Sequence, residues 1–340
     1  MTKCLELAKL AQGDTSPNPM VGCVILNENN EIISTGYHKK YGENHAERDA
    51  LLKLDNAANC TLIVNLEPCS HYGKTPPCAD LIIEKGIKKV VFGMTDPNPL
   101  VAGKGLEKLR KAGIEVIGPL MEDDCKKLNE VFITNQTEHR VFVALKTATT
   151  LDGKIATHSG DSKWITSAPA REEVRNIRKI YNAILTSSST VIADNPTMFH
   201  KKKIILDREL KTNINSTIYA QGEIYVCYDE KLNAPQDIEN IHYIPTPVKN
   251  NQLDVKYILG TLFELGIRSI LVESGGILNG SFLEYTDKIY HFTAPKVLGD
   301  NSGKSAFDGK TTDKISQATN FQIEDVKLFP PDLLVIYTKG

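Results

Sequence analysis

The sequence predicts an α/β protein with two domains, and three observations lead to that prediction. Strand-like and helix-like segments alternate along most of the chain, a pattern typical of βαβ units with a mostly parallel sheet between helix layers. The chain has 340 residues, about twice the length of a common domain. Hydrophobic residues make up 41% of it, which is enough to fill real cores.

The first 120 residues predict a series of short elements. Residues 4–11 carry apolar side chains at helical spacing, and an apolar run at 20–26 lies between a Ser-Pro-Asn-Pro break and an Asn-Glu-Asn-Asn turn. The further strands are expected at 31–37, 61–66, 89–94 and 114–117. The further helices are expected at 46–54, 78–85 and 106–112.

A polar stretch at 135–140 is the best candidate for a domain boundary, so we expect domains at 1–140 and 141–340. The alternation of elements restarts after it. Strands of the second domain are expected at 141–146, 183–186, 203–207, 223–227, 269–273 and 288–293, and helices at 168–180 and 255–265.

Composition narrows the class of function. The formal charge of −2 removes the bulk electrostatic argument for nucleic acid or an anionic membrane as the main partner. No apolar run approaches the ~18 residues of a membrane span, and the N-terminal residues lack a signal-peptide core. Seven cysteines, an odd number, argue against a disulfide scaffold. We therefore expect a cytoplasmic protein whose cysteines ligate metal, take part in catalysis or pack in a core.

Three residues have the types and spacing of a zinc site. His45 stands where a loop enters a helix, Cys69 follows the end of a strand, and Cys78 opens the next helix. One imidazole and two thiolates suit a single Zn²⁺ and leave one tetrahedral position for water. Glu47 can reach that water without being a ligand. Zinc nucleobase deaminases divide the work in this way: a metal-activated hydroxide attacks the ring carbon, and the glutamate moves protons.

A closed structural zinc site is the main alternative, and it would need a fourth ligand. Cys23 and Cys60 are present, but each lies in or beside an apolar strand, so we expect both in the core. Eight residues separate the two cysteine ligands, instead of the usual two. The long loop between them brings His71 and Lys74 to the mouth of the site, where they would orient a base carbonyl or pair with a phosphate. A solvated polar loop is the alternative for these two side chains.

Small and hydroxyl residues follow several strands of the second half. The segments 146–154, 183–191 and 271–276 each end a strand in this way, and such residues let backbone N–H groups approach phosphate oxygens at a helix N-terminus. No Gly-x-Gly-x-x-Gly occurs there, so the standard dinucleotide-binding fingerprint is absent. On these residues alone, dinucleotide binding and tight turns are equally well supported.

The first-half motifs resemble those of one family. They look like the deaminase half of the bacterial bifunctional riboflavin biosynthesis protein (diaminohydroxyphosphoribosylaminopyrimidine deaminase/5-amino-6-(5-phosphoribosylamino)uracil reductase), in residues 17–19, 21–24, 36–38, 45–47, 66–78 and 96–103. That resemblance implies a cytidine-deaminase-like three-layer α/β/α domain. It also implies zinc on His45, Cys69 and Cys78, with Glu47 as the proton shuttle. Finally, it implies substrate contacts from Asn18, His38 and Lys74.

The second half resembles the reductase half of the same family, which is similar to dihydrofolate reductase in fold and uses NADPH. The residues that this resemblance assigns to the substrate side are Lys146, Ser162, Trp164, Arg178 and Asp194. Those assigned to the cofactor side are Thr166, Ser187, Ser188, Ser189, Thr190, Glu273, Ser274, Gly275 and Gly276. Asp194 and Glu273 are the catalytic candidates, because hydride transfer itself is the cofactor's chemistry and the protein supplies polar contacts near the reacting carbon.

The resemblance implies a hydrolase and an oxidoreductase on one chain. The first would deaminate 2,5-diamino-6-(5-phosphoribosylamino)pyrimidin-4-one, and the second would reduce the ribosyl group of the resulting 5-amino-6-(5-phosphoribosylamino)uracil to ribityl. The partners would be this small phosphorylated pyrimidine and, by analogy, further copies of the chain in a homo-oligomer.

One departure from the family pattern keeps alternatives open. After Asp-Asn-Pro the family continues with Leu-Thr-x-Arg, whereas residues 197–203 run into the next strand without that arginine. His200 or Lys201 would then have to replace it as a point charge for a substrate phosphate. The alternatives are an active deaminase with an impaired reductase half, a nucleic-acid base deaminase with a C-terminal binding module, and a zinc-stabilised scaffold without catalysis.

Overall fold

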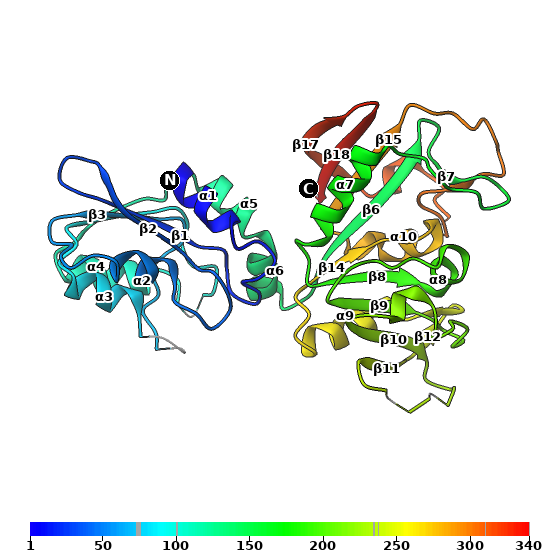
Figure 1. Cartoon of the computed structure of the whole chain (residues 1–340), viewed down its shortest axis with the longest axis horizontal. Helices are drawn as coiled ribbons and strands as arrows, with labels where there is room; N and C mark the ends of the chain where they lie inside the picture. Colours follow the sequence, from blue (N-terminus) through cyan, green and yellow to red (C-terminus); the bar gives the residue numbers. More distant parts are fainter. Residues whose placement is uncertain (73–75, 100, 234, 237, 310, 340) are drawn as a thin grey trace. The chain divides into compact units, whose positions relative to one another are not determined.

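The computed structural model describes residues 1–72, 76–99, 101–233, 235–236, 238–309 and 311–339. The chain divides into two compact units, Met1–His139 and Arg140–Gly340, and each is described here by itself (Figure 1). No helix in the described ranges is long and apolar enough to cross a membrane.

The first unit is built on a five-stranded sheet with the strand order β2-β1-β3-β4-β5. The β3–β4 and β4–β5 pairs are parallel, but β1 is antiparallel to both β2 and β3. The expectation of a mostly parallel sheet is therefore wrong for this unit, because a short turn joins β1 to β2 as a hairpin and no crossover separates them. The strands are β1 (Gly22–Leu26), β2 (Ile32–Tyr37), β3 (Thr61–Val64), β4 (Lys89–Phe92) and β5 (Glu115–Ile117).

Helices cover both faces of this sheet (Figure 1). A Cβ on Gly22 would lie 2.1 Å from the carbonyl oxygen of Cys4, and one on Gly36 would lie 2.3 Å from that of Ala46. Gly22 and Gly36 are one register step apart in the β1–β2 pair and so point to opposite faces. Glycine thus lets α1 and α2 approach the sheet from its two sides. The helices are α1 (Thr2–Lys9), α2 (Ala46–Leu51), α3 (Cys78–Glu84), α4 (Lys104–Lys111), α5 (Glu122–Leu128) and α6 (Glu130–Glu138).

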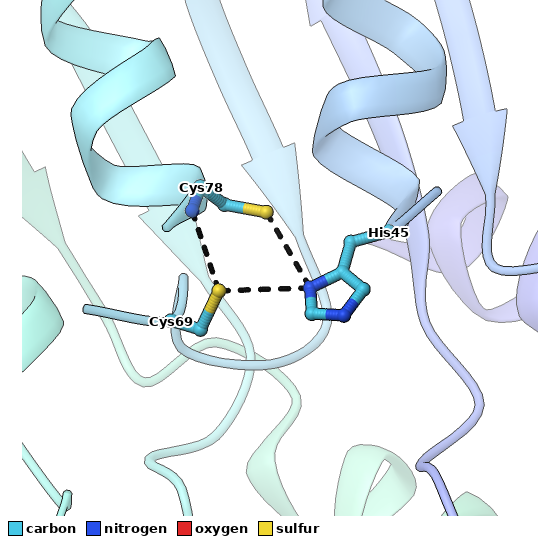
Figure 2. Close-up of side chains that lie close together, drawn as sticks. All are labelled: His45, Cys69 and Cys78. Carbon is cyan, nitrogen blue, oxygen red and sulfur yellow. Dashed lines mark hydrogen bonds between the residues drawn. The ribbon is translucent and has the colours of Figure 1, made fainter. Parts of the chain in front are cut away.

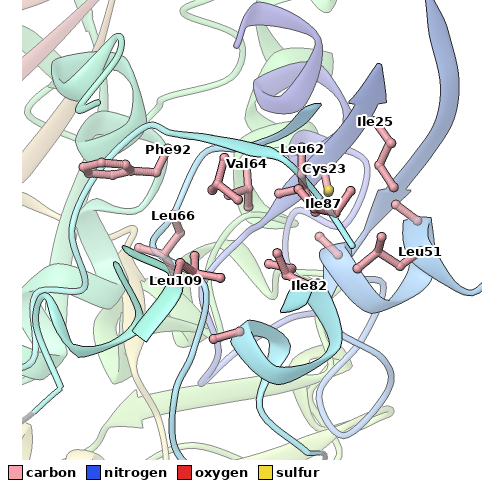
Figure 3. Close-up of a cluster of buried hydrophobic side chains, with 14 of the residues drawn as sticks. Cys23, Ile25, Leu51, Leu62, Val64, Leu66, Ile82, Ile87, Phe92 and Leu109 are labelled. Atoms are coloured by element: carbon pink, nitrogen blue, oxygen red, sulfur yellow. The ribbon is translucent and has the colours of Figure 1, made fainter. Parts of the chain in front are cut away.

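The core of the first unit lies between the sheet and the helices and includes Cys23, Ile25, Leu62, Val64 and Ile82 (Figure 3). Cys23 and Cys60, whose core positions the sequence predicts, are 0% and 6% exposed. The helices α5 and α6 have no counterpart among the expected elements. Residues 135–138, expected to form a polar boundary, belong to α6.

The second unit contains a nine-stranded sheet with the order β11-β10-β9-β8-β14-β6-β15-β18-β17. Its pairs are parallel from β11 to β15, as the alternating pattern predicts, and the last two are antiparallel. The strands of this sheet are β6 (Phe142–Thr150), β8 (Ala183–Ser187), β9 (Lys202–Leu206), β10 (Glu223–Asp229), β11 (Ile241–Thr246), β14 (Ser269–Val272), β15 (Lys288–Ala294), β17 (Phe321–Phe329) and β18 (Asp332–Lys339).

In the described part of this unit, two further two-stranded sheets and several helices accompany the main sheet. The sheets pair β12 (Val248–Lys249) with β13 (Gln252–Leu253) and β7 (Lys154–Ala156) with β16 (Lys304–Ser305). The helices are α7 (Ala168–Arg178), α8 (Ser188–Asp194), α9 (Val255–Glu264), α10 (Gly276–Phe282) and the short 3₁₀ turns η1 (Thr217–Tyr219), η2 (Leu283–Tyr285) and η3 (Ile315–Gln317).

The hydroxyl-rich segment after β8 corrects one expectation. The sequence left a tight turn and a dinucleotide-binding segment equally open there. The tight turn is wrong, because residues 188–194 form α8, which the Ser187 hydroxyl caps by accepting a hydrogen bond from the Thr190 N–H. The strands β8, β14 and β6 are adjacent and parallel, so their carboxyl ends meet at one edge. The segments of small and hydroxyl residues that the sequence analysis identifies, 146–154, 183–191 and 271–276, therefore lie together at that edge.

Candidate active sites

His45, Cys69 and Cys78 converge in the first unit. His45 immediately precedes α2, Cys69 lies in the loop after β3, and Cys78 is the first residue of α3. Figure 2 shows the imidazole directed at both sulfur atoms. The His45 Nδ1 lies 3.5 Å from Cys69 Sγ and 3.6 Å from Cys78 Sγ, and all three donor atoms lie within 4.8 Å of one another.

These separations fit a tetrahedral zinc ion. Zinc bonds of about 2.0–2.3 Å to nitrogen and sulfur place neighbouring ligand atoms about 3.3–3.8 Å apart. The donor set of one imidazole and two sulfurs is also the one that zinc prefers. Hydrogen bonds from Cys78 lower the pKa of Cys69, against the opposing effect of burial. The backbone N–H of Cys78 is one of these donors, 3.3 Å from Cys69 Sγ. Cys69 is therefore favoured as a thiolate, the form that a metal requires. The pKa of Cys78 is raised in turn, because its thiol hydrogen-bonds to Cys69 and is buried.

Glu47 lies in the first turn of α2 and is only 4% exposed. Burial raises its pKa to about 7, and the negative charge of Cys69 adds to the effect. A carboxyl group with a pKa near neutrality can both accept and release a proton at physiological pH. Glu47 thus has the protonation behaviour of a general acid and base beside the three donor atoms.

A cavity of about 390 Å³ adjoins this cluster. His45, Glu47 and Cys69 line it together with three expected substrate residues, Asn18, His38 and His71. Lys74 lies outside the described residues. The cavity-lining residues that were not expected as site residues are Pro19, Val21, Tyr41, Gly42, Glu43, Leu66, Glu67, Asp96, Asn98, Val101, Phe132 and Gln136.

His38 and Asn18 hold each other in place at the cavity. The Nδ1 of His38 lies 3.0 Å from the carbonyl oxygen of Asn44, so this nitrogen is the donor. Its Nε2 then accepts from the Asn18 amide at 3.1 Å. Burial lowers the pKa of His38, which favours the neutral ring that this pattern requires. The pair therefore presents the carboxamide of Asn18 in a fixed orientation.

Glu67 fixes one wall of the same cavity. Its carboxylate is 5% exposed and accepts hydrogen bonds from the N–H groups of Asp96, Gly103 and Gly105. A Cβ on Gly105 would lie 1.9 Å from the carbonyl oxygen of Pro68. The segment before Cys69 is thus joined closely to the 96–105 segment.

The second unit has a buried charge cluster. Arg178 donates from Nε and a terminal nitrogen to the two carboxylate oxygens of Glu273, at 2.6 and 3.0 Å. Lys146 Nζ lies 3.5 Å from the same carboxylate. Burial alone would raise the pKa of Glu273, but Lys146 and Arg178 bring it below its ordinary value. Three residues that the sequence assigns to this half therefore form one cluster.

Hydroxyl groups gather where β8 and β14 end. Ser187 Oγ lies 2.7 Å from Ser274 Oγ and 3.1 Å from Thr190 Oγ1. Ser189 also contacts Ser187, at 2.8 Å. Among the neighbouring predicted residues, Ser188 and Gly275 are half-buried and Gly276 is buried.

Other predicted residues of the second unit lie at or near its surface. Trp164 is 62% exposed, with the Arg171 guanidinium 4.4 Å from its ring centroid. Asp194 is exposed and lies 3.9 Å from Lys163 Nζ. Ser162 is half-buried and Thr166 is buried just before α7. None of these is a member of the Glu273 cluster within the ranges that the structure describes.

Comparisons with known proteins cover both units. The family described as the cytidine and deoxycytidylate deaminase zinc-binding region matches residues 1–94, and the RibD C-terminal domain family matches residues 141–335. The riboflavin biosynthesis protein RibD of Actinobacillus pleuropneumoniae is 39% identical over 353 residues, which cover 99% of this chain and 94% of that protein. The chain belongs to the RibD family.

A solved structure of a RibD relative agrees over the full length. The diaminohydroxyphosphoribosylaminopyrimidine deaminase/5-amino-6-(5-phosphoribosylamino)uracil reductase of Thermotoga maritima has a TM-score of 0.89 and 40% identity, covering 100% of this chain and 97% of its own. The RibD structure of Acinetobacter baumannii, form 1, has a TM-score of 0.88 and 34% identity over the same shares.

RibD membership confirms the predicted family, the fold of both halves and the bifunctional activity. The chain is a riboflavin biosynthesis enzyme with a zinc-dependent deaminase domain and a reductase domain that uses a nicotinamide cofactor. It acts on a small molecule.

Some of the cavity-lining residues that the sequence did not predict lie in a motif that it did single out, and others do not. Asp96, Asn98 and Val101 belong to the 96–103 motif, so their motif was noticed but not their role. Phe132 and Gln136 lie on α6, which no motif marked. Nothing in the residues around Phe132 and Gln136 indicates that they line a cavity.

His200, one of the two replacement cations that the sequence offers after Pro196, makes hydrogen bonds within the chain. The Nε2 of His200 lies 3.0 Å from the carbonyl oxygen of Tyr181 and donates to it. Its Nδ1 lies close to the backbone of Lys202, 2.8 Å from the carbonyl oxygen and 3.1 Å from the N–H, from which a neutral ring accepts. Burial lowers the pKa of His200, which disfavours the cation. His200 therefore does not fit the role of a phosphate-binding charge.

Proposed function

We propose that the first unit hydrolyses the 2-amino group of 2,5-diamino-6-(5-phosphoribosylamino)pyrimidin-4-one. The second unit then reduces the ribosyl group of 5-amino-6-(5-phosphoribosylamino)uracil to ribityl with NADPH. The observation that carries the deaminase is the cluster of His45, Cys69 and Cys78 with Glu47 at one cavity. The two activities named for the Thermotoga maritima relative support the order of the steps.

His45, Cys69 and Cys78 would hold one zinc ion, because their donor atoms have the right identity and spacing. Bound zinc supplies Lewis-acid activation of water at neutral pH. Glu47 takes a proton from the attacking water and delivers it to the ring nitrogen next to C2. It then carries the proton of the new C2 hydroxyl to the amino group, so that the C2 carbonyl forms and the C–N bond breaks to release ammonia. Glu47 lines the cavity together with His45 and Cys69, so it faces the space in which the water and the substrate would meet.

Substrate binding in the first unit falls to side chains around the cavity. The oriented carboxamide of Asn18, supported by His38, would hydrogen-bond the pyrimidine. His71 lines the cavity and would contact the polar end of the substrate. Lys74, outside the described residues, would pair with the substrate phosphate as a point charge, because a lysine ammonium is a compact cation with three donors.

In the second unit, Glu273 would position Lys146 and Arg178 beside the sugar, and Asp194 would add a polar contact near the reacting carbon. Ser162 and Trp164 would complete the substrate side. The hydroxyls at the ends of β8 and β14 would bind the cofactor phosphates, since small residues there leave N–H groups accessible. The proposed cofactor residues remain Thr166, Ser187, Ser188, Ser189, Thr190, Glu273, Ser274, Gly275 and Gly276.

A two-stage assay tests the proposal on the purified full chain with zinc. Ammonia release from the diaminopyrimidine is followed first, and NADPH consumption on the isolated deaminated product second. Both stages should be active, and NADPH should exceed NADH in kcat/KM. A zinc-loaded chain that releases no ammonia would overturn the deaminase proposal.

A second candidate function is a deaminase whose reductase half is impaired. The engaged ring of His200 favours it, since the arginine expected after Pro196 then has no substitute at that residue. It predicts normal ammonia release together with a raised KM for the phosphorylated uracil in the second stage.

Location in the cytoplasm and assembly into a homo-oligomer stay predictions from the sequence.

A further inference from the structure

The helix α6 contributes a wall to the deaminase cavity. Phe132 and Gln136 both line the cavity and are four residues apart, so they lie on the same face of the helix. Both lie beyond residue 94, where the match to the deaminase zinc-binding region ends. This wall is therefore an addition to the part of the unit that carries the metal donors.

The start of α6 is anchored to the cavity. Asn129, just before the helix, is 2% exposed. Its side-chain oxygen accepts from the Met20 N–H at 2.8 Å, and its side-chain nitrogen donates to the Met20 carbonyl at 3.0 Å. Met20 stands between Pro19 and Val21, which both line the cavity. The position of Phe132 and Gln136 is thus set before any substrate arrives.

Gln136 differs from the other carboxamides of the cavity. Asn18 is bonded to His38, and Asn98 also makes contacts within the chain. The side chain of Gln136 makes no hydrogen bond to any described residue. A primary carboxamide offers one acceptor oxygen and two N–H donors. It therefore remains available to a ligand in the cavity.

We propose that Gln136 recognises the 4-oxo and 5-amino groups of the pyrimidine while Phe132 packs against the ring. This inference rests on the proposed deaminase function. The 4-oxo group is an acceptor and the neighbouring 5-amino group is a donor, so one carboxamide can pair with both. These groups lie on the side of the ring opposite the C2 amino group that reacts, and so face away from the metal donors. In cytosine the 4-amino group is itself the group that reacts, and no amino group lies across the ring from it, so the donor half of the pair is absent.

The test compares two substrates on the zinc-loaded full chain, in the wild type and in Gln136 variants. Ammonia release is measured with the diaminopyrimidine and with the same compound lacking the 5-amino group. Each neutral hydrogen bond contributes about 0.5–1.5 kcal/mol, so the wild type should favour the 5-amino compound about 3–10-fold in kcat/KM. In Gln136→Met this preference should fall to about 1, and Gln136→Ala, a second variant, should give the same ratio.

Thr137→Val is the matched control. Thr137 is exposed on the same helix and does not line the cavity, so the preference should be unchanged. Phe132→Leu should raise KM for both compounds and leave the preference intact. Ammonia release by the wild type combined with an unchanged preference in both Gln136 variants would overturn this inference alone. A wild type with bound zinc and no ammonia release would overturn the proposed deaminase function and the inference with it.

Discussion

The Arg178 guanidinium makes two parallel hydrogen bonds to the buried carboxylate of Glu273, one from Nε and one from a terminal nitrogen. Arg178 ends α7 and Glu273 directly follows β14, so this pair joins a surface helix to the centre of the second sheet. Glu273 is 6% exposed and cannot draw on solvent to balance its charge. The pair therefore supports the fold as well as the proposed reductase site.

Removal of Arg178 should destabilise the second unit. Breaking a buried ion pair costs about 3–5 kcal/mol, but Lys146 remains 3.5 Å from the carboxylate, so we expect roughly 1–3 kcal/mol for Arg178→Met. Urea unfolding followed by the fluorescence of Trp164, the single tryptophan, measures this. The exposed Arg175→Met on the same helix is the control and should change stability by less than about 0.5 kcal/mol. Equal effects of the two variants would contradict the prediction.

The same pair predicts a pH dependence. The pKa of Glu273 lies below its ordinary value of 4.5 in the folded chain. The resulting stabilisation is fully present above the unfolded pKa and is lost as pH falls through the folded pKa. The stability difference between wild type and Arg178→Met should thus be constant from about pH 7 to pH 5 and shrink below about pH 4.5. Unfolding curves at a series of pH values measure it, and a difference that grows on acidification would have the wrong sign.

Zinc removal should separate the two activities. A chelator should abolish ammonia release and leave NADPH consumption on the deaminated product within about twofold, and added zinc should restore the first. Metal analysis should give about one zinc per chain. Cys69→Ser should lose the metal, whereas Cys60→Ala, which removes a buried core thiol, should keep it. Stoichiometric zinc in Cys69→Ser would exclude this residue as a ligand.

The sequence was sufficient to select three residues that converge in the structure, His45, Cys69 and Cys78, because their signals are local. His45 and Cys78 stand at helix starts that apolar spacing and motifs reveal, and both elements begin at the expected residues. The strands that coincide with apolar runs in the sequence were also predicted, with ends that differ by a few residues. Each of these inferences needed only neighbouring positions along the chain.

The parts that could not be predicted depend on contacts distant in sequence. The position of Gln136 in the cavity follows from the bonds between Asn129 and Met20, which are 109 residues apart. Most side chains of the edge strand β17 are exposed, so buried and exposed positions do not alternate along it. Its sequence therefore lacks the period-two hydrophobic pattern that predicts a strand. The partnership of Arg178 with Glu273 spans 95 residues, and neither side chain alone indicates the other.

Glu47→Gln should retain zinc and lose ammonia release. The amide keeps the size of the side chain but cannot take up or release a proton, so kcat should fall by about 10²–10⁴. The next carboxylate of α2, Asp49, pairs with Lys53 at 3.0 Å, and Asp49→Asn is the matched control with activity within a few-fold of wild type. Metal analysis accompanies both assays. Wild-type turnover by a zinc-loaded Glu47→Gln chain would remove Glu47 from the mechanism.

Gly105→Ala should disturb the deaminase site from outside the cavity. Its new Cβ would lie 1.9 Å from the Pro68 carbonyl oxygen and 3.2 Å from the Glu67 carboxylate, so the segment leading to Cys69 must move. Such overpacking costs about 1–3 kcal/mol, and we expect weaker zinc retention together with lower ammonia release. Gly260→Ala is the control, because a Cβ there meets no atom within 4 Å and its position inside α9 should make the change neutral or stabilising by up to about 1 kcal/mol. Competition for zinc with a chelator, measured on both variants, decides the matter: equal retention would mean that the 96–105 segment does not support the metal donors.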